Sequence, residues 1–563
     1  MCAIPLRHGL LGLGAVVLSL QLCAQTAPDA GRLLQEQPKP PAALPAKPVS
    51  PAAADAMPEA DAGPRFQVQG FRIQGAVLVP AEELTALLNP LVGRALTLRQ
   101  IQAAAAQLTA HYLRKGYLAR VIVPPQDIQD GIVTLQVIEG KRGALHVRSA
   151  HAQLDSARVQ RFIEGRLQTG DAFDLRQLNT ALTILNEQPG LQVSSSIKPG
   201  QQDGDIDLLI NASALPPVEA NLAVNNHGSR GTDAAQVSGG VTFNNLTGHW
   251  DALVLTANLS EGTQFGRADY SLAVGDRGWR LGINASSMRY HLTQDSFAAL
   301  QGRGTADTIG LTASYPLARD TDFSLSLTAS ADGKHLVDHT VAGETGDRQV
   351  RTATAGLQGD ATGDIGVTSF GVHLTTGHSD QRNPGALAAD VGRRDVQGGF
   401  TKLGFSLNQL LPLGADWRLS AGLRGQIANT NLDSSERMSL GGPSAIRAYP
   451  TGEASGDEAW LINLNLSRQV GDGLMGNLFL DAGGVRVNRK LWTGWDLFSP
   501  NLRNRYELAG LGLSLDWRIS PRLLLNATVA APLGNNAGQN NGLNADGSAA
   551  NQVRGWISLT ARI

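Results

Sequence analysis

From about residue 216 to its end, the chain alternates apolar and polar residues in segments of about ten residues. In one segment only Ser and Thr oppose Phe323, Leu325, Leu327 and Ala329. Successive side chains of a strand lie on opposite faces, so each segment predicts a strand with one apolar face. We count about sixteen segments, and after the first 24 residues no apolar run reaches eighteen residues. Lipid cannot satisfy unpaired backbone groups, so a membrane-spanning chain of this kind must close its strands into a barrel.

The links between these segments alternate between short and long. Turns such as 276–278 and 471–473 are short, whereas links such as 334–349 and 429–457 are much longer. Short turns at one end and long loops at the other are typical of bacterial outer-membrane barrels. A soluble two-sheet sandwich would alternate as well, but it does not explain this rhythm. An interfacial aromatic girdle is expected from four tryptophans on the apolar faces near segment ends, namely Trp279, Trp417, Trp460 and Trp517.

Residues 1–24 are expected to be a secretory signal peptide, because a polar start at Arg7 and His8 precedes an apolar stretch and a small residue, Ala24. A lipoprotein signal at Cys23 is the weaker alternative, because the preceding Leu22 is bulky. Both cysteines lie in this segment, so the mature chain is expected to hold neither a disulfide nor a thiolate metal site.

The segment from residue 25 to residue 37 is expected to contain a short helix, with Asp29 as its N-cap. Residues 38–65 are rich in Pro and Ala and predict an extended linker. At roughly 3.1 Å per residue such a linker reaches on the order of 80 Å, so the helix can lie far from the next domain.

Two similar modules follow the linker. Residues 66–140 and residues 141–212 each predict the order β-α-α-β-β, and Leu98-Arg99-Gln100-Ile101 matches Leu175-Arg176-Gln177-Leu178 at the start of the second helix. The chain is therefore predicted to be mostly β, with two α+β modules before a 16-stranded antiparallel barrel at 213–563.

Composition and motifs argue against several functions. The formal net charge is −2, which gives no basic field for nucleic acid. The sequence contains no zinc-protease, phosphate-loop, nucleophile-elbow or dinucleotide motif, and its 11 His residues lack metal-ligand spacing. We therefore expect neither an enzyme nor a cofactor or metal site.

One pair of segments carries a more specific signal. The longest loop contains Arg447, Ala448 and Tyr449, and the thirteenth strand contains Asp481. The apolar stripe of that strand places Asp481 on the lumenal face, because a charge facing lipid costs roughly 2–4 kcal/mol near mid-membrane. A partly desolvated carboxylate favours a cation, and Arg447 supplies one if the loop folds inward. An exposed loop arginine and a solvated lumenal aspartate remain the alternative.

These segments resemble the TpsB transporters of two-partner secretion, the haemolysin secretion and activation family within the outer-membrane assembly-factor superfamily. The resemblance is carried by residues 29–36, 116–117, 123–126, 137–140, 185–190, 446–449 and 479–483. It implies two POTRA domains, a sixteen-strand barrel, a plug helix carrying Leu33 and Leu34, and a lock between loop six and strand thirteen formed by Arg447, Tyr449 and Asp481. Ala448 departs from the more usual glycine of the loop-six motif.

The expected function is export of a secreted partner protein through the barrel. The POTRA domains would capture the unfolded passenger, with Pro124, Pro125 and Gln126 as candidate contacts. The other expected partners are outer-membrane lipid and, during biogenesis, the barrel-assembly machinery. An insertase of the same superfamily is the first alternative, disfavoured by the presence of two modules rather than three or five. A structural or adhesive barrel is the second, and it has no use for a periplasmic arm.

Overall fold

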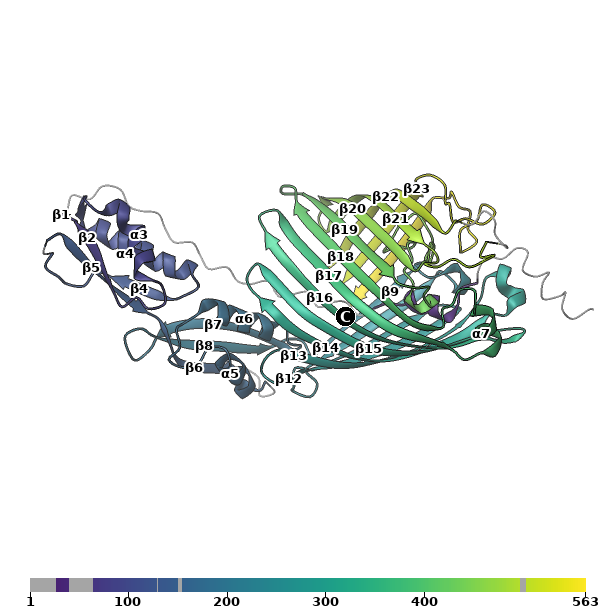
Figure 1. Cartoon of the computed structure of the whole chain (residues 1–563), viewed down its shortest axis with the longest axis horizontal. Helices are drawn as coiled ribbons and strands as arrows, with labels where there is room; N and C mark the ends of the chain where they lie inside the picture. Colours follow the sequence, from purple (N-terminus) through teal and green to yellow (C-terminus); the bar gives the residue numbers. More distant parts are fainter. Residues whose placement is uncertain (1–26, 40–63, 129, 150–153, 497–502) are drawn as a thin grey trace, which may run out of the picture.

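The computed structural model describes residues 27–39, 64–128, 130–149, 154–496 and 503–563 (Figure 1). The expected signal peptide at 1–24 and most of the expected linker at 38–65 lie outside the described residues. The described chain forms an arm of two small modules, followed by a barrel with the short helix α2 (Ala30–Gln35) inside it. None of the described helices combines the length and the apolar character needed to cross a membrane.

Sixteen strands close the barrel, as predicted, and each strand pairs antiparallel with its neighbours. The last strand returns to the first through the register Ser558↔Asn225 to Arg562↔Asn221. The strands are β9 (Val218–Asn225), β10 (Gln236–Asn244), β11 (Ala252–Leu259), β12 (Thr263–Val274), β13 (Trp279–His291), β14 (Arg303–Arg319), β15 (Phe323–Thr340), β16 (Gly343–Gly363), β17 (Gly366–Gln381), β18 (Gly398–Pro412), β19 (Trp417–Ala428), β20 (Glu458–Gly471), β21 (Leu474–Arg486), β22 (Arg505–Ser520), β23 (Leu523–Pro532) and β24 (Arg554–Arg562).

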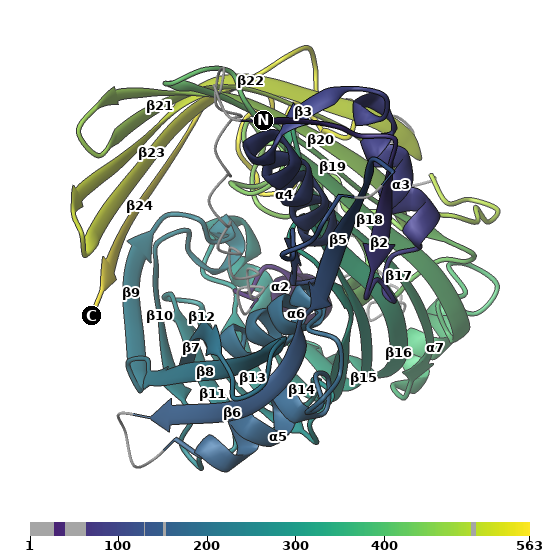
Figure 2. The ribbon, with the colours of Figure 1, turned by 90° about the vertical axis from the view of Figure 1, so that its left-hand side faces the viewer.

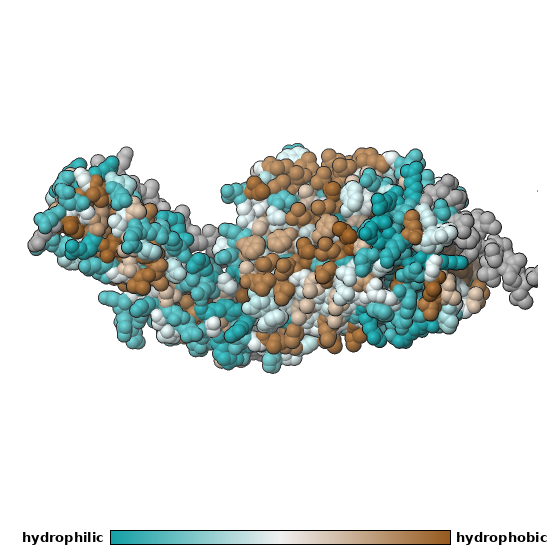
Figure 3. Space-filling view, in the orientation of Figure 1, coloured by the Kyte–Doolittle hydropathy of each residue, from teal (hydrophilic) through white to brown (hydrophobic). Residues whose placement is uncertain are grey.

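The alternation places an apolar band on the outside of the barrel. Figure 3 shows this band across the middle of the visible barrel face, with hydrophilic surface on either side. The four predicted girdle tryptophans are all exposed on the outer surface: Trp279, Trp417, Trp460 and Trp517. The strands are longest at β15 and β16, which extend the barrel wall beyond the band. Short elements in the long loops are η2 (Arg230–Thr232), η3 (Asp295–Leu300), α7 (Pro384–Asp390) and η4 (Ser434–Glu436).

One predicted loop is wrong. Residues 334–349 were expected to be a long link, but they form the ends of β15 and β16 and a tight turn between Thr340 and Gly343. The polar residues that suggested a loop are lumenal side chains such as Lys334 and Asp338, which contact other segments inside the barrel. The many polar residues of 334–349 therefore belong to a β-hairpin whose two faces are both polar, and not to an irregular loop.

The arm modules have the predicted order, with one addition. The expected first strand at 66–74 divides at Val68, where the backbone turns to bond with Arg94, so β1 pairs with β3 and β2 joins the main sheet. The first module contains β1 (Arg65–Gln67), β2 (Gly70–Gln74), α3 (Ala81–Leu88), η1 (Asn89–Leu91), β3 (Ala95–Thr97), α4 (Leu98–Arg114), β4 (Ala119–Ile122) and β5 (Ile132–Glu139). The second contains β6 (Lys141–Ser149), α5 (Ser156–Glu164), α6 (Leu175–Asn186), β7 (Leu191–Pro199) and β8 (Asp205–Ala214).

Backbone hydrogen bonds join the two modules. The Leu175 N–H donates to the Gly116 carbonyl at 2.8 Å, and the Phe173 N–H donates to the Gly140 carbonyl at 2.8 Å. Gly116 has φ +88°, and a side chain there would collide with Arg176 of the second module. The first module therefore meets the second without a flexible connection at these residues.

The second module is docked on the barrel through the turn between β10 and β11. Trp250 of that turn is buried in the hydrophobic core of the module, where its ring meets Phe162 edge-on at 6.1 Å. The Arg158 guanidinium lies 4.3 Å over the same ring and donates to the Ala273 carbonyl at 2.8 Å. Arg319 of β14 also pairs with Glu187 at 2.7 Å. In the view along the arm, α6 lies in front of the barrel mouth (Figure 2).

We predict that Trp250→Ala releases the second module from the barrel. Removing a buried Trp typically costs about 3–5 kcal/mol, and here the loss falls on the contact between two domains. Limited proteolysis of the purified protein should then cut faster near Leu215–Pro217, the connection between β8 and β9. Trp279→Ala, at an outward-facing site, is the control and should leave that rate unchanged. Equal rates for Trp250→Ala and the parent protein would contradict the docking.

Candidate functional site

Loop six, residues 429–457 between β19 and β20, folds into the barrel rather than away from it. Its apolar side chains form a core with lumenal side chains of the wall, in which Ile446 and Tyr449 are fully buried. Ile446 also donates its N–H to the Leu440 carbonyl at 2.7 Å, which closes the loop on itself. The loop therefore has a fixed shape and presents its tip to the barrel wall.

The tip presents Arg447 to Asp481 of β21. The Arg447 Nε donates to Asp481 Oδ2 at 2.9 Å, and Nη2 donates to Oδ1 at 2.7 Å, which is a bidentate pair. The backbone N–H of Arg447 donates to Oδ2 at 3.0 Å, so main chain and side chain hold the same carboxylate. Asp481 is fully buried, and the alternation of β21 places it in the lumen as predicted.

Three further residues complete this contact, and the sequence analysis did not single them out. Asn463 donates to Asp481 Oδ1 at 2.7 Å, and Asn465 accepts from Arg447 Nη2 at 2.8 Å. Trp556 of β24 donates its indole N–H to the Arg447 carbonyl at 2.8 Å. Both asparagines are lumenal, and Asn463 pairs directly with Asp481 across β20 and β21. Strand register, once known, is the signal that identifies them.

The neighbours of Arg447 in the loop are also enclosed. Ala448 packs against Gly510 of β22, where a side chain on the glycine would overlap the Ala448 methyl group. Gly510 therefore leaves room for the Ala448 methyl group, which the glycine more usual at this position of the loop would not have. Tyr449 packs in the loop core, and its hydroxyl has no partner among the described residues. Burial raises the pKa of Tyr449 to about 12.

Helix α2 lies inside the ring of barrel strands (Figure 2) and contacts η4 of loop six. Asp29 is its N-cap and accepts the Arg32 N–H at 2.9 Å, as the sequence predicts. Leu33 is 1% exposed within a cluster of lumenal side chains, and Leu34 packs against the same cluster. The C-terminal end of the helix is held by Gln37, which accepts from Asn258 at 2.9 Å.

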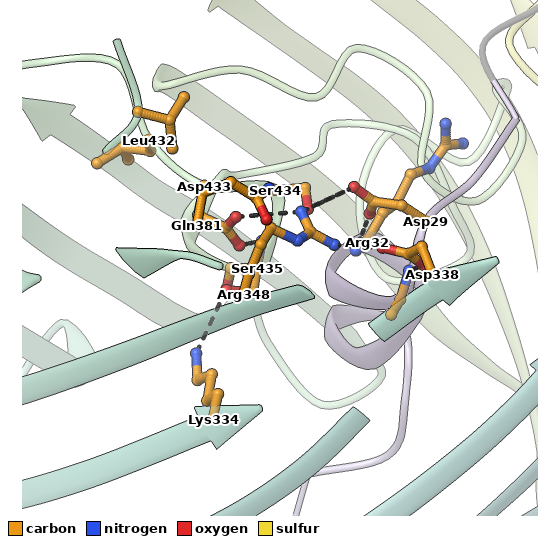
Figure 4. A network of polar contacts seen from close by, with 12 residues as sticks. Asp29, Arg32, Lys334, Asp338, Arg348, Gln381, Leu432, Asp433, Ser434 and Ser435 are labelled. Atoms are coloured by element: carbon orange, nitrogen blue, oxygen red, sulfur yellow. Dashed lines mark hydrogen bonds and ion pairs between the residues drawn. The ribbon is translucent and has the colours of Figure 1, made fainter. Parts of the chain in front are cut away.

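The cap residue of α2 is bound to the barrel by charge. Asp29 accepts from Arg348 of β16 at 3.1 Å and from the Ser434 hydroxyl of loop six at 2.8 Å (Figure 4). Burial raises the pKa of the Asp29 carboxyl, but attraction by Arg348 and the hydrogen bonds from Arg32 and Ser434 outweigh it. The pKa of Asp29 therefore lies below its ordinary value, and the residue is held as a carboxylate.

The predicted passenger contacts lie in the link between β4 and β5, at an edge of the first module's sheet. The Gln126 amide is used within the module: it donates to the Thr134 carbonyl at 2.7 Å and accepts the Thr134 N–H at 2.7 Å. Pro125 is exposed and Pro124 is half-buried. Gln126 therefore stabilises the module itself. Among the three predicted contacts Pro125 is the accessible residue, and Pro124 is partly accessible.

A polar cavity lies between the second module and the barrel. It has a volume of about 620 Å³ and is lined by the C-terminal end of α6 and by lumenal residues of β13 to β18. Hydroxyl and amide side chains line much of it, for example Ser324, Thr328, Gln358, Ser369 and Asn408, beside apolar side chains. Within the described residues no three His, Cys, Asp or Glu side chains gather in a way that could hold a metal ion.

Comparison with known proteins agrees with this geometry. The model of the haemolysin secretion/activation protein ShlB/FhaC/HecB matches residues 204–513, and the POTRA domain model of ShlB type matches residues 66–140. The heme/hemopexin transporter protein HuxB of Haemophilus influenzae (strain 86-028NP) is 27% identical over 81% of this chain and 82% of its own length. The hemolysin transporter protein ShlB of Serratia marcescens is 26% identical over 83% of this chain and 85% of its own.

Solved structures share the fold. CdiB from Escherichia coli aligns with a TM-score of 0.69 at 22% identity, over 90% of this chain and 92% of that one. BamA from Haemophilus ducreyi, lacking POTRA domains 1–3, aligns with a TM-score of 0.51 at 15% identity, over 88% of this chain and all of that one. The resemblance to the TpsB transporters of two-partner secretion is thus confirmed. The chain belongs to the haemolysin secretion/activation (ShlB/FhaC/HecB) family, outer-membrane transporters whose POTRA domains lie in the periplasm.

Proposed function

We propose that this protein exports one secreted partner protein, of the haemolysin or adhesin kind, by threading it unfolded through the barrel. The observation that carries the proposal is the content of the lumen. Sixteen strands enclose more space than their own side chains fill, and α2 and loop six occupy that space. Both segments are held by apolar packing together with polar contacts, and the polar contacts can be exchanged for water.

The periplasmic cavity suits an unfolded chain. Its hydroxyl and amide side chains exchange hydrogen bonds with a passing backbone without selecting a sequence. Arg280 and Arg319 are its cationic members, and Arg319 is neutralised by Glu187 of the POTRA domain. Transport needs no nucleotide in this scheme, because folding of the passenger outside the cell gives direction.

The POTRA arm would bind the passenger first. In each module a three-stranded sheet leaves edge strands, β2 and β4 in the first and β6 and β7 in the second. An extended chain can add to such an edge through backbone hydrogen bonds, while apolar side chains at the edge provide selection. Lipid of the outer membrane surrounds the barrel, and the barrel-assembly machinery inserts it during biogenesis.

We predict that the arm selects the passenger. Residues 66–212 should retain the N-terminal region of the passenger in a pull-down, because this part carries the sheet edges. Pro125→Ala is expected to weaken retention more than Gln126→Ala does at equal folding, since Pro125 is the exposed residue of the link. Equal retention by a barrel that lacks the arm would overturn this part of the proposal.

We predict that α2 is a removable plug. Deleting residues 28–37 should raise single-channel conductance in planar bilayers and leave barrel assembly intact, judged by heat-modifiable gel mobility. Leu33→Ser should raise the frequency of opening without changing the size of the fully open step, because it weakens the buried apolar contact of the helix. Unchanged conductance after the deletion would show that α2 does not close the pore.

We predict that Arg447→Ala strongly reduces secretion of the passenger. Removing one member of a buried pair typically costs about 3–5 kcal/mol, much of it from the charge left behind at Asp481. Arg447→Lys should rescue poorly, since an ammonium group cannot replace the bidentate contact. Asp481→Ala should give a similar defect, and the double variant should be no worse than either single one.

Secretion in this experiment is measured as passenger in the medium per folded barrel. The matched control is Arg267→Ala, which removes another lumenal arginine that pairs with an aspartate, Asp269, and does not touch loop six. It should secrete normally. Additive losses in the Arg447/Asp481 double variant would mean that the residues act separately. A general loss of other outer-membrane barrels on depletion of this protein would favour the insertase alternative instead.

A further inference from the structure

A second buried arginine inside the barrel touches three separate segments of the chain. Arg348 of β16 donates through Nη1 to Asp29 Oδ2 at 3.1 Å, to Asp433 Oδ2 at 3.1 Å and to Ser434 Oγ at 3.0 Å. Its Nη2 donates to Asp338 Oδ2 of β15 at 2.6 Å. One guanidinium thus contacts the plug, the base of loop six and the barrel wall, and Figure 4 shows it between them.

The wall side of this contact also binds the plug helix. Asp338 Oδ1 accepts the Ala30 N–H of α2 at 2.9 Å and the Tyr290 hydroxyl at 2.6 Å. A carboxylate at the N-terminus of a helix stabilises it through the free N–H groups and the helix dipole. Arg348 and Asp338 together therefore recognise an acidic N-cap and the backbone that follows it.

The loop side is bound just as closely. The Ser434 hydroxyl that meets Arg348 also donates to Asp29 at 2.8 Å, so plug and loop share a hydrogen bond. Gly31 of α2 lies directly against Ser434 and Ser435, and any side chain at that glycine would collide with them. The base of loop six therefore packs on the first turn of the plug.

Charge makes the guanidinium necessary for this arrangement. Asp29, Asp338 and Asp433 all contact Arg348, and the next nearby cation, Arg437, pairs with Asp457 at 3.1 Å. Without Arg348 the three carboxylates would lie close together with no cation between them, and repulsion would separate the segments that carry them. When the plug leaves, Arg348 keeps Asp338 and Asp433 as partners, while the base of loop six loses its hydrogen bond to Asp29 and its packing against Gly31.

We propose that Arg348 is the positioning residue that couples the plug to loop six, so that release of α2 weakens the contacts of the loop base and loosening of the loop base favours release of α2. This rests on the proposed transport function and names the residue that regulates it. The base of loop six at Asp433 and its tip at Arg447 are then held by two different anchors, of which only the first includes the plug.

The test is single-channel recording of the full-length protein in planar bilayers. Arg348→Ala should raise the ratio of open to closed time about 10- to 100-fold, the range expected for loss of a charged hydrogen bond. Arg348→Lys should restore only part of the closed time, because one compact ammonium group cannot occupy the two positions from which Nη1 and Nη2 donate. The open conductance should match that of the variant without residues 28–37.

The decisive variant is Asp433→Asn, which alters the loop and leaves every residue of the plug unchanged. Coupling predicts that it raises opening to a similar extent as Asp29→Asn, and that the double variant opens no more than either single one. Asp332→Asn is the matched control: it is a lumenal aspartate of β15 whose carboxylate accepts from Ser330 and lies outside this contact. It should behave like the parent protein.

The outcomes separate the two proposals. If deletion of residues 28–37 opens the pore but Asp433→Asn does not, α2 is a plug and the coupling through Arg348 is refuted. If Asp29→Asn and Asp433→Asn act additively, plug and loop are held independently, which also refutes the coupling. If the deletion itself leaves conductance unchanged, α2 does not close the pore, and the plug in the proposed function is refuted before the coupling is tested. Asp29→Asn lies outside the barrel strands, so a defect in barrel assembly cannot mask the result.

Discussion

Lipid offers no hydrogen bonds to an unpaired strand edge, and this constraint shapes the whole molecule. It requires β24 to return to β9 and close sixteen strands into a barrel. A barrel of that size has a lumen that side chains of the wall cannot fill alone. The chain therefore brings other segments inside, α2 from its N-terminal region and loop six from between β19 and β20. The same closure that permits transport leaves a lumen that α2 and loop six occupy.

The lumenal fillers need contacts that are specific but reversible. Apolar packing alone would bury these segments as a permanent core. Arginine–carboxylate pairs fix the orientation of a segment but add little net stability. Loop six uses both, with an apolar core around Ile446 and Tyr449 and one bidentate pair at its tip. Helix α2 relies on a smaller apolar contact at Leu33 and on charge at its N-cap. The plug is thus the more weakly bound of the two.

Much of this could be predicted from local pattern. Alternation gives the strands, their number and the lumenal side of Asp481, because side-chain direction in a strand depends only on parity. The pairing of Arg447 came from resemblance, since no spacing in a sequence brings a loop tip to a wall 34 residues away. The hairpin at 334–349 was missed because strands that extend past the lipid have two polar faces. Contacts of Arg348 join residues 319 and 85 positions apart, which no local pattern encodes.

The two arginine anchors differ in a way that suits their tasks. Asp481 accepts from Arg447 at three atoms and from Asn463, so one charge meets one charge and every partner belongs to the wall or the loop tip. Arg348 meets three carboxylates, and the one from Asp29 belongs to the N-terminus of α2, which is part of neither the barrel wall nor loop six. Breaking the first contact strands a buried charge on each side. Breaking the second removes a surplus carboxylate and leaves Arg348 neutralised. In the proposed gating, these contacts favour a loop tip that stays in place and a helix α2 that leaves and returns.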